Sequence, residues 1–369
     1  MAKMTKRERV ERAMNLQETD KVPIYDLVRS DSFFEHFSGK KLPPLAEDKE
    51  TEDKLLKIAG SSLDNFLDMT RDVGFGPTVE KDLVDELGFT KHFSVKEKTN
   101  WIVKRPFEDE KGAIEFLKKW ILLQKKAHKE LKENAKTFRE KWHANFLKTQ
   151  STIGDTVNLL ACQGTGLDEL RHNIGLDLFS YLECDDPGLL SEFLEVTTDY
   201  RVEMCHIIAD KKLSPCVLTY GDIACKNMLL HSPAYLRREF CPRLKKLNDA
   251  WHEHGIKCLF HSDGYLMEIM EDLITTGIDG LNPIETVAGM NLKEVKEKYG
   301  KKIFLTGGID MSQLLSMGTS EQVRTVCEEA VKDARPGYFL GSTTEIDNSA
   351  KLENIIAMYE TVKKTITDS

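Results

Sequence analysis

The sequence lacks the features that mark membrane, secreted and nucleic-acid-binding proteins. No stretch approaches the roughly 18 consecutive apolar residues of a membrane-spanning helix, and residues 1–15 lack the apolar centre of a signal peptide. The eight cysteines include no C-x-x-C pair, which favours buried thiols in a reducing compartment over a disulfide framework. A formal net charge of −9 argues against binding to a phosphate backbone. We therefore expect a cytoplasmic protein that binds neither membranes nor nucleic acids.

A complete nucleotide-binding fingerprint is also absent. The nearest fragment, GTGLDEL at 164–170, lacks the third glycine of G-x-G-x-x-G, which argues against a doubly wound sheet. Instead, apolar runs typical of buried strands alternate with helix-like stretches, and this alternation predicts parallel βαβ units. The strand-like runs lie at 256–260, 278–284, 302–306 and 338–341, and two further strand-and-loop units lie at about 156–166 and 215–227.

We predict an α/β fold, a (β/α)₈ TIM barrel that spans residues 1–369 as a single domain. Extra N-terminal helices cover about residues 1–60, and a charged helical insertion covers about residues 111–150. Apolar residues such as Trp120 and Leu131 give this insertion a partly amphipathic pattern. We interpret its many basic residues as a solvated face rather than a binding surface.

Polar residues follow the predicted strands, and active sites of such barrels lie at the carboxyl ends of the strands. Single members of this set also have ordinary interpretations: Asp222 or Asp310 as a helix cap, Asn282 as a turn residue and Tyr220 as core. Their recurrence at equivalent places favours a shared site. The set comprises Gln163, Thr165, Tyr220, Asp222, His261, Asp263, Asn282, Glu285, Gly307, Gly308, Asp310 and Glu345.

The sequence His-Ser-Asp at 261–263 is the strongest candidate within that set. His261 and Asp263 alternate along one strand, so both side chains point to the same side and Ser262 points away. An imidazole and a carboxylate suit a zinc ion or a similar divalent cation, or act together as an oriented acid and base. A metal site would need a further ligand from elsewhere in the chain.

Several segments along the chain have a recognisable order and spacing. They are MTKRERVERAMNLQETDKVPI, YGDIACKNMLLHSPAYLRREF, LFHSDGYLMEIM, GIDGLNPIE, AGMNLKEVKEKYG, TGGID and LENIIAMYE. In this order they resemble the uroporphyrinogen decarboxylase superfamily, specifically its corrinoid-dependent methyltransferase branch, over nearly the whole chain apart from 111–150. The resemblance implies a (β/α)₈ barrel whose mouth receives a separate cobalamin-carrying protein. The chain has no D-x-H-x-x-G signature of a corrinoid carrier, so we expect it to borrow the cofactor from that partner.

Two departures narrow the function that the resemblance implies. Thiol-methylating members use an H-x-C pair and a later cysteine, whereas this chain has Asp263 and the cysteine-free loop GSTTEI. Porphyrinogen decarboxylases carry an arginine-rich RQAGR segment, whereas this chain has VPIYDLVRSDSFF with only Arg29. The resemblance therefore implies cleavage of a methyl ether, such as a methoxylated aromatic, and transfer of its methyl group to Co(I) of a corrinoid protein.

We expect His261, Asp263 and Glu345 to be catalytic, and His261, Glu285 and Glu345 to bind a divalent metal, with zinc as the first candidate. Residues Tyr220, Asp222, Asn282 and Asp310 are expected to orient the substrate. Three alternatives stay open: methylation of a thiol, decarboxylation of a smaller substrate, and a barrel that only binds a corrinoid protein or its ligand. The aligned acids argue against the last of these.

Overall fold

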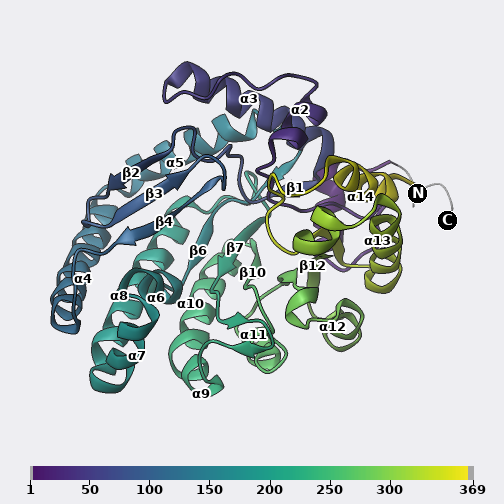
Figure 1. Ribbon diagram of the computed structural model, residues 1–369. Helices are drawn as coiled ribbons and strands as arrows, with labels where there is room; N and C mark the ends of the chain where they lie inside the picture. The colour runs from purple at the N-terminus through teal and green to yellow at the C-terminus, as the bar shows by residue number, and fades with distance from the viewer. Residues whose placement is uncertain (1–2, 365–369) are drawn as a thin grey trace.

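Parallel strands form a closed barrel at the centre of the molecule, and helices surround it (Figure 1). The computed structural model describes residues 3–364. Six strands follow the hydrogen-bonded order β13-β12-β11-β10-β7-β6, and β1 pairs in parallel with β5. The barrel strands are the bridged residues Ile24 and Tyr25, β1 (Met69–Thr70), β5 (Val157–Asn158) with β6 (Cys162–Gly164), β7 (Cys216–Tyr220), β10 (Lys257–His261), β11 (Gly280–Ile284), β12 (Phe304–Ile309) and β13 (Tyr338–Ser342).

The first and last strands close the ring. The Tyr25 N–H donates to the Leu340 carbonyl at 3.0 Å, and the Leu340 N–H donates to the Pro23 carbonyl at 2.9 Å. Helical connections then cover the outside of the barrel, as the alternating pattern predicts, and the strand ends differ from the predicted runs by a few residues. These connections are α6 (Leu167–Ile174), α7 (Leu176–Asp185), α8 (Pro187–Ile208), α9 (Pro233–Tyr235), η1 (Leu236–Phe240), α10 (Cys241–His252), α11 (Met270–Thr275), η2 (Thr286–Ala288), α12 (Leu292–Tyr299), η3 (Met311–Leu315), α13 (Ser320–Ala334) and α14 (Leu352–Lys364).

Alternation along β10 decides which of its side chains reach the barrel interior. Cys258 and Phe260 pack among the residues of the outer helices, whereas Leu259 packs inside the barrel with Phe304. The next inward position along β10 is His261, at the carboxyl end of the strand. The strand pattern therefore places this histidine directly above the apolar interior, in the barrel mouth.

Helix α1 (Lys6–Met14) covers the opposite end of the barrel. Its Val10 joins the interior cluster around Leu259. On its other side, the Arg9 guanidinium is 4% exposed; its Nε donates to Asp20 Oδ1 at 2.6 Å, and Nη1 pairs with Asp68. This buried ion pair attaches α1 to the strands that begin the barrel.

The chain makes two long excursions before the regular strand–helix units begin. Helices α2 (Asp31–Ser38) and α3 (Lys49–Phe66) follow the first strand, so the predicted extension of residues 1–60 contains that strand, and α1 precedes it. An antiparallel sheet and two long helices follow β1; the sheet was not predicted, because its mostly exposed strands lack a buried apolar face. These elements are β2 (Lys81–Val84), β3 (Thr90–Ser94), β4 (Thr99–Lys104), α4 (Glu110–Glu133) and α5 (Ala135–Gln150); a short hairpin, β8 (Ala224–Cys225) and β9 (Met228–Leu229), follows β7.

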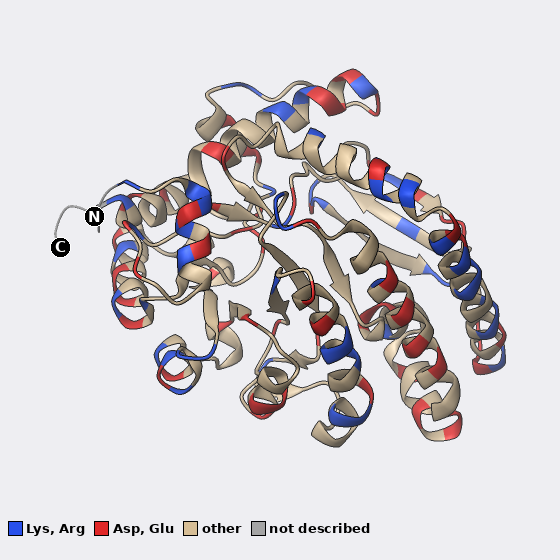
Figure 2. Cartoon of the chain, turned by 180° about the vertical axis from the view of Figure 1, so that it is seen from behind, with Lys and Arg blue, Asp and Glu red and all other residues tan. Residues whose placement is uncertain are grey.

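Helix α4 carries bands of both charges along the outside of the molecule (Figure 2). Its inner face packs on α8, where the ring centroids of Trp120 and Phe193 are 4.4 Å apart. Within residues 3–364, no helix combines the length and apolar character that crossing a membrane requires.

Candidate active site

His261 is held by a short hydrogen-bond chain across three neighbouring strands. The Asn282 amide donates from Nδ2 to Thr306 Oγ1 at 2.6 Å, and this hydroxyl donates in turn to the Leu281 carbonyl at 3.3 Å. The Asn282 Oδ1 atom is therefore left as the acceptor that faces His261 Nδ1, 2.8 Å away. This arrangement assigns the ring proton of His261 to Nδ1 and leaves a lone pair on Nε2.

The surroundings of His261 also keep its imidazole uncharged. Burial lowers the pKa of His261, and the Arg71 guanidinium lowers it further, to about 4. The Arg71 Nη1 atom lies 3.3 Å from His261 Nδ1. Because a guanidinium only donates hydrogen bonds, this approach is a close contact between two donors when Nδ1 carries its proton. The imidazole of His261 is therefore uncharged at neutral pH, the form that can act as a base or bind a metal ion.

Two carboxylates face the free nitrogen of His261. Its Nε2 atom lies 3.7 Å from Asp222 Oδ1, and ligand atoms of Asp222, His261 and Asp263 all lie within 4.8 Å of one another. The Oδ1 atoms of Asp222 and Asp263 are buried and have no hydrogen-bond partner. Burial raises the pKa of Asp263 to about 7, and the charges of Asp222 and Glu285 add to this effect. We call these three residues the mouth cluster.

The donor set of the mouth cluster fits a divalent cation. A neutral imidazole nitrogen and carboxylate oxygens are ligands that zinc accepts, and buried oxygens without partners need a proton or a cation. Asn282 would support such a site, because its hydrogen bond fixes the ring orientation and the tautomer of His261. Ser262 points away from the cluster, as strand alternation requires: its hydroxyl accepts from the Ile223 N–H at 3.2 Å.

The loop after β7 presents Asp222 to the cluster. The Asp222 N–H donates to Asp168 Oδ2 at 2.7 Å, and the Asp222 carbonyl accepts from Arg171 Nη1 at 2.6 Å. Both partners belong to α6, so this helix holds the backbone of the loop. The Asp222 side chain does not cap a helix in the described structure, which favours a functional role over the capping interpretation.

Glu285 and Glu345 were predicted to bind a metal together with His261, but the structure does not place them among the ligand atoms around this residue. Neither belongs to the mouth cluster as the described residues define it. Glu285 Oε2 accepts from the Gly264 N–H at 2.6 Å. Glu345 lines a small cavity of about 20 Å³ beside His261 and Arg71. Burial opposes ionisation of Glu345, but its hydrogen bonds and the nearby Arg71 lower the pKa overall. The geometry favours Asp222 over both glutamates as a ligand.

Asp310 and Tyr220 have structural roles that do not require a bound substrate. Asp310 caps η3, where its two carboxylate oxygens accept from the N–H groups of Ser312, Gln313 and Leu314 at 2.9–3.1 Å. These bonds favour the capping interpretation over substrate orientation. The Tyr220 ring packs so closely on Gly164 that a Cβ at Gly164 would lie 2.8 Å from it.

Two residues of the mouth were missed by the sequence analysis. Arg71 follows the two-residue strand β1, and Cys162 begins β6 with its thiol exposed; the Cys162 Sγ lies 3.8 Å from the Arg71 carbonyl. The Tyr25 hydroxyl, on the first strand, is also buried without a hydrogen-bond partner. The available signal was the rule that polar residues at strand ends line the mouth, but strands this short have no apolar run that marks them.

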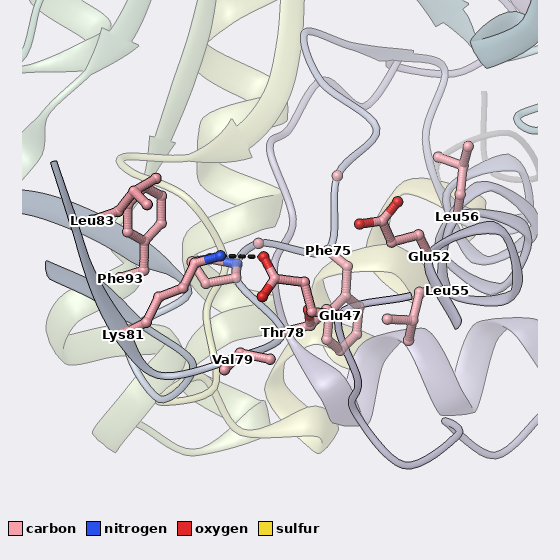
Figure 3. Close-up of a pocket in the computed structure, with 13 residues that line it drawn as sticks. Glu47, Glu52, Leu55, Leu56, Phe75, Thr78, Val79, Lys81, Leu83 and Phe93 are labelled. Carbon is pink, nitrogen blue, oxygen red and sulfur yellow. Dashed lines mark hydrogen bonds and ion pairs between the residues drawn. The ribbon is translucent and has the colours of Figure 1, made fainter. Parts of the chain in front are cut away.

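A larger cavity of about 500 Å³ lies apart from these residues (Figure 3). It is formed by α3, the loop after β1 and the β2–β3 sheet, and its walls include Leu55, Phe75 and Leu83. The ion pair between Glu47 and Lys81 spans its polar side. None of the residues predicted to act in catalysis lines it.

Comparisons with known proteins agree with this fold. The family model described as "Uroporphyrinogen decarboxylase (URO-D)" matches residues 175–365, which is more than half of the chain. A solved methyltransferase from Methanosarcina mazei has a similar fold, with a TM-score of 0.68, 17% sequence identity, and coverage of 98% of this chain and 99% of that one. No curated protein matches the sequence. The chain belongs to the uroporphyrinogen decarboxylase family.

Proposed function

We propose that the protein is a methyltransferase that cleaves a methyl ether, such as a methoxylated aromatic, and passes the methyl group to the reduced corrinoid of a separate protein. The mouth cluster of Asp222, His261 and Asp263 carries the proposal, because it offers two oxygens and one nitrogen to a cation or a proton. The similarity in fold to a solved methyltransferase over nearly the whole chain supports the reaction class.

The chemistry of an ether explains why such a cluster is useful. The methyl group leaves with the cobalt of the corrinoid as its acceptor, the C–O bond breaks, and the electron pair of that bond remains on the oxygen. This oxygen is a poor leaving group unless its growing charge is neutralised. A divalent ion such as zinc, held by the mouth cluster, would supply a Lewis acid for this purpose.

The residues of the chain have separable tasks in this scheme. His261 offers Nε2 because Asn282 holds the proton on Nδ1. Asp222 and Asp263 supply oxygen donors, and with a pKa of about 7 Asp263 also retains a proton in part of the molecules at neutral pH. Arg71 adds a positive charge beside the site, which favours an anionic product.

Oxygen donors favour an ether over a thiol as the substrate. Thiolate activation by zinc benefits from a sulfur-rich site, and no cysteine of the described chain belongs to the mouth cluster. The thiol of Cys162 also lies in the mouth region, where it contacts the Arg71 carbonyl. Methylation of a free thiol is therefore an outcome that the experiment has to separate from ether cleavage.

The test combines metal analysis with product analysis. Purified protein, loaded with zinc, is incubated with a panel of methoxyarenes and a reduced corrinoid protein, and the released phenol and the methylated corrinoid are measured. We expect one zinc per chain and equal amounts of phenol and methylated corrinoid. The variants His261→Ala and Asp222→Asn should form neither product. The control variant Asp310→Asn, outside the mouth cluster, should retain the fold and the metal. Methylation of an added thiol or release of carbon dioxide, without phenol formation, would overturn the proposal.

A further inference from the structure

The barrel wall has a gap between β1 and β6. Strands β1 and β5 pair at Met69 with Val157 and at Thr70 with Asn158. After this point the chain turns away, and β6 pairs with β7 instead. The Leu159 N–H still donates to the Thr70 carbonyl at 2.9 Å, but among residues 3–364 no strand pairing continues from β1 beyond Thr70 toward β6. The otherwise closed barrel therefore has an opening between the two strand edges beyond this point.

Helix α5 covers this opening and leaves a cavity of about 200 Å³ beneath it, which we call the side pocket. Its walls come from the helix, from the loop after β1 and from the chain between β5 and β6. Trp142 and Phe146 give it an aromatic wall, and its polar groups include Arg71, Asp72 and Asn158. The Asp72 carboxylate is paired with the Arg29 guanidinium at 3.2 Å, which offsets its charge. The second helix of the charged insertion at 111–150 therefore forms one wall of an open pocket that shares Arg71 with the active site.

Two polar atoms of the side pocket have no partner within the chain. The Nε1 donor of Trp142 and the Oδ1 acceptor of Asn158 are buried and make no hydrogen bond. Asn158 is 8% exposed. An unsatisfied buried donor or acceptor costs about 1–3 kcal/mol, so a donor and an acceptor that line one cavity favour a polar ligand there.

Arg71 lies between the side pocket and the active site. It lines both the side pocket and the small cavity beside His261. No carboxylate of the described chain lies within ion-pair distance of its guanidinium, although Asp263 and Glu345 act on it from farther away. A cation in a protein crevice without an ion-pair partner is stabilised by an anionic ligand, and a guanidinium binds a carboxylate through two parallel hydrogen bonds.

We propose that the side pocket binds a single-ring aromatic acid, with its carboxylate on Arg71 and its ring against Trp142 and Phe146. A protein cavity of about 150 Å³ holds one benzene molecule, so about 200 Å³ has room for one substituted ring. The inference goes beyond the proposed function, because it concerns binding of the acid and not its reaction. Arg71 Nη1 lies 3.3 Å from His261 Nδ1, so the guanidinium that would bind the carboxylate also contacts the active-site histidine.

Binding is measured on the full chain, without metal and without a corrinoid protein. The probe is 3-methoxybenzoate, and the neutral 3-methoxybenzyl alcohol is its matched control; titration calorimetry gives both affinities. We expect Arg71→Gln to weaken binding of the acid by about tenfold or more and binding of the alcohol by less than about twofold. Arg139→Gln, on the outer side of α5, serves as the control for loss of a positive charge. Equal affinity of wild type and Arg71→Gln for the acid would overturn the inference.

Tryptophan fluorescence provides a second measurement, for which a conservative substitution is sufficient. The acid is expected to quench part of the emission of the wild-type protein, and the conservative Trp142→Phe variant is expected to lose that quenching while the other tryptophans still emit. Unchanged quenching in Trp142→Phe would show that the acid binds elsewhere. Because binding is measured without turnover, its result does not depend on methyl transfer. Unchanged affinity of Arg71→Gln for the acid refutes the side pocket alone, whereas absence of phenol and methylated corrinoid in the assay of the proposed function refutes that function alone.

Discussion

Metal binding at the mouth cluster should release a proton in a narrow range of pH. The carboxyl of Asp263 has a pKa of about 7 in the metal-free protein, because burial and the neighbouring carboxylates disfavour its charge. A cation binds the ionised form, so the affinity rises as the pH rises through 7 and falls as the pH falls. His261, with a pKa of about 4, is already neutral throughout this range and contributes no pH dependence.

The magnitude follows from the fraction of Asp263 that is ionised. A carboxyl with a pKa of about 7 is about 90% ionised at pH 8 and about 10% ionised at pH 6, so zinc affinity should fall about tenfold between these values, equivalent to about 1.4 kcal/mol. The same reasoning gives about 0.9 protons released per zinc at pH 6 and about 0.1 at pH 8.

Calorimetry in buffers of different ionisation enthalpy measures the released protons directly. Competition with a chromophoric chelator at pH 6, 7 and 8 gives the affinities, corrected for protonation of the chelator. Asp263→Asn is the matched variant, because it keeps the volume and cannot ionise; it should bind zinc more weakly and with an almost flat pH profile. A wild-type affinity that is the same at pH 6 and pH 8, or equal proton release by Asp263→Asn, would refute this account of Asp263.

Three further outcomes follow from the same structure. Asn282→Ala should weaken zinc binding about 10- to 100-fold without unfolding the protein, because it removes the acceptor that holds the proton on Nδ1 of His261. Chelator competition measures the zinc affinity and circular dichroism the fold; an unchanged affinity would contradict this prediction. Asp222→Asn should lose zinc and Glu345→Gln should keep it, as metal analysis after dialysis would reveal; the opposite order restores the glutamate as the ligand. Arg9→Ala should lower the free energy of unfolding by about 3 kcal/mol in a urea titration, because it leaves the buried Asp20 without its guanidinium and Asp68 with Lys21 alone. A loss below about 1 kcal/mol would show that water or Lys21 replaces the guanidinium.

The sequence predicted the regular part of the barrel well, because each unit there contains its own signals. An Asn or a Thr directly before a helical stretch is such a signal: Asn291 and Thr319 cap the helices that follow them, and Thr319 forms a full capping box with Gln322. The strands at the N-terminal side were not predictable in the same way. Tyr25 and Met69 belong to strands of one or two paired residues, whose positions depend on neighbours from distant parts of the chain.

The candidate site was predictable at strands with a clear apolar run, because alternation along such a strand indicates which residues at its end point into the mouth. The His-x-Asp spacing predicted that His261 and Asp263 lie close together, and in the structure Asp263 follows the end of β10 with its ligand atom within 4.8 Å of that of His261. Asn282 lies next to His261 on the adjacent strand. The third member of the cluster, Asp222, was expected to orient substrate instead. Arg71 was not predicted at all, because a single charged residue after a very short strand has the same appearance in a sequence as any surface arginine.

The closure of the barrel between its first and last strands has a consequence for synthesis of the chain. The Asp26 carboxylate accepts from the N–H of Ser342, a partner 316 residues away along the chain. At about 5–20 residues per second on the ribosome, the first strand waits at least about 15 seconds before its partner emerges. During that time the nascent sheet has two open edges, which are templates for pairing with other chains. We therefore expect ribosome-bound chains that end before β13 to be strong clients of chaperones, and release of the last strand to end that dependence.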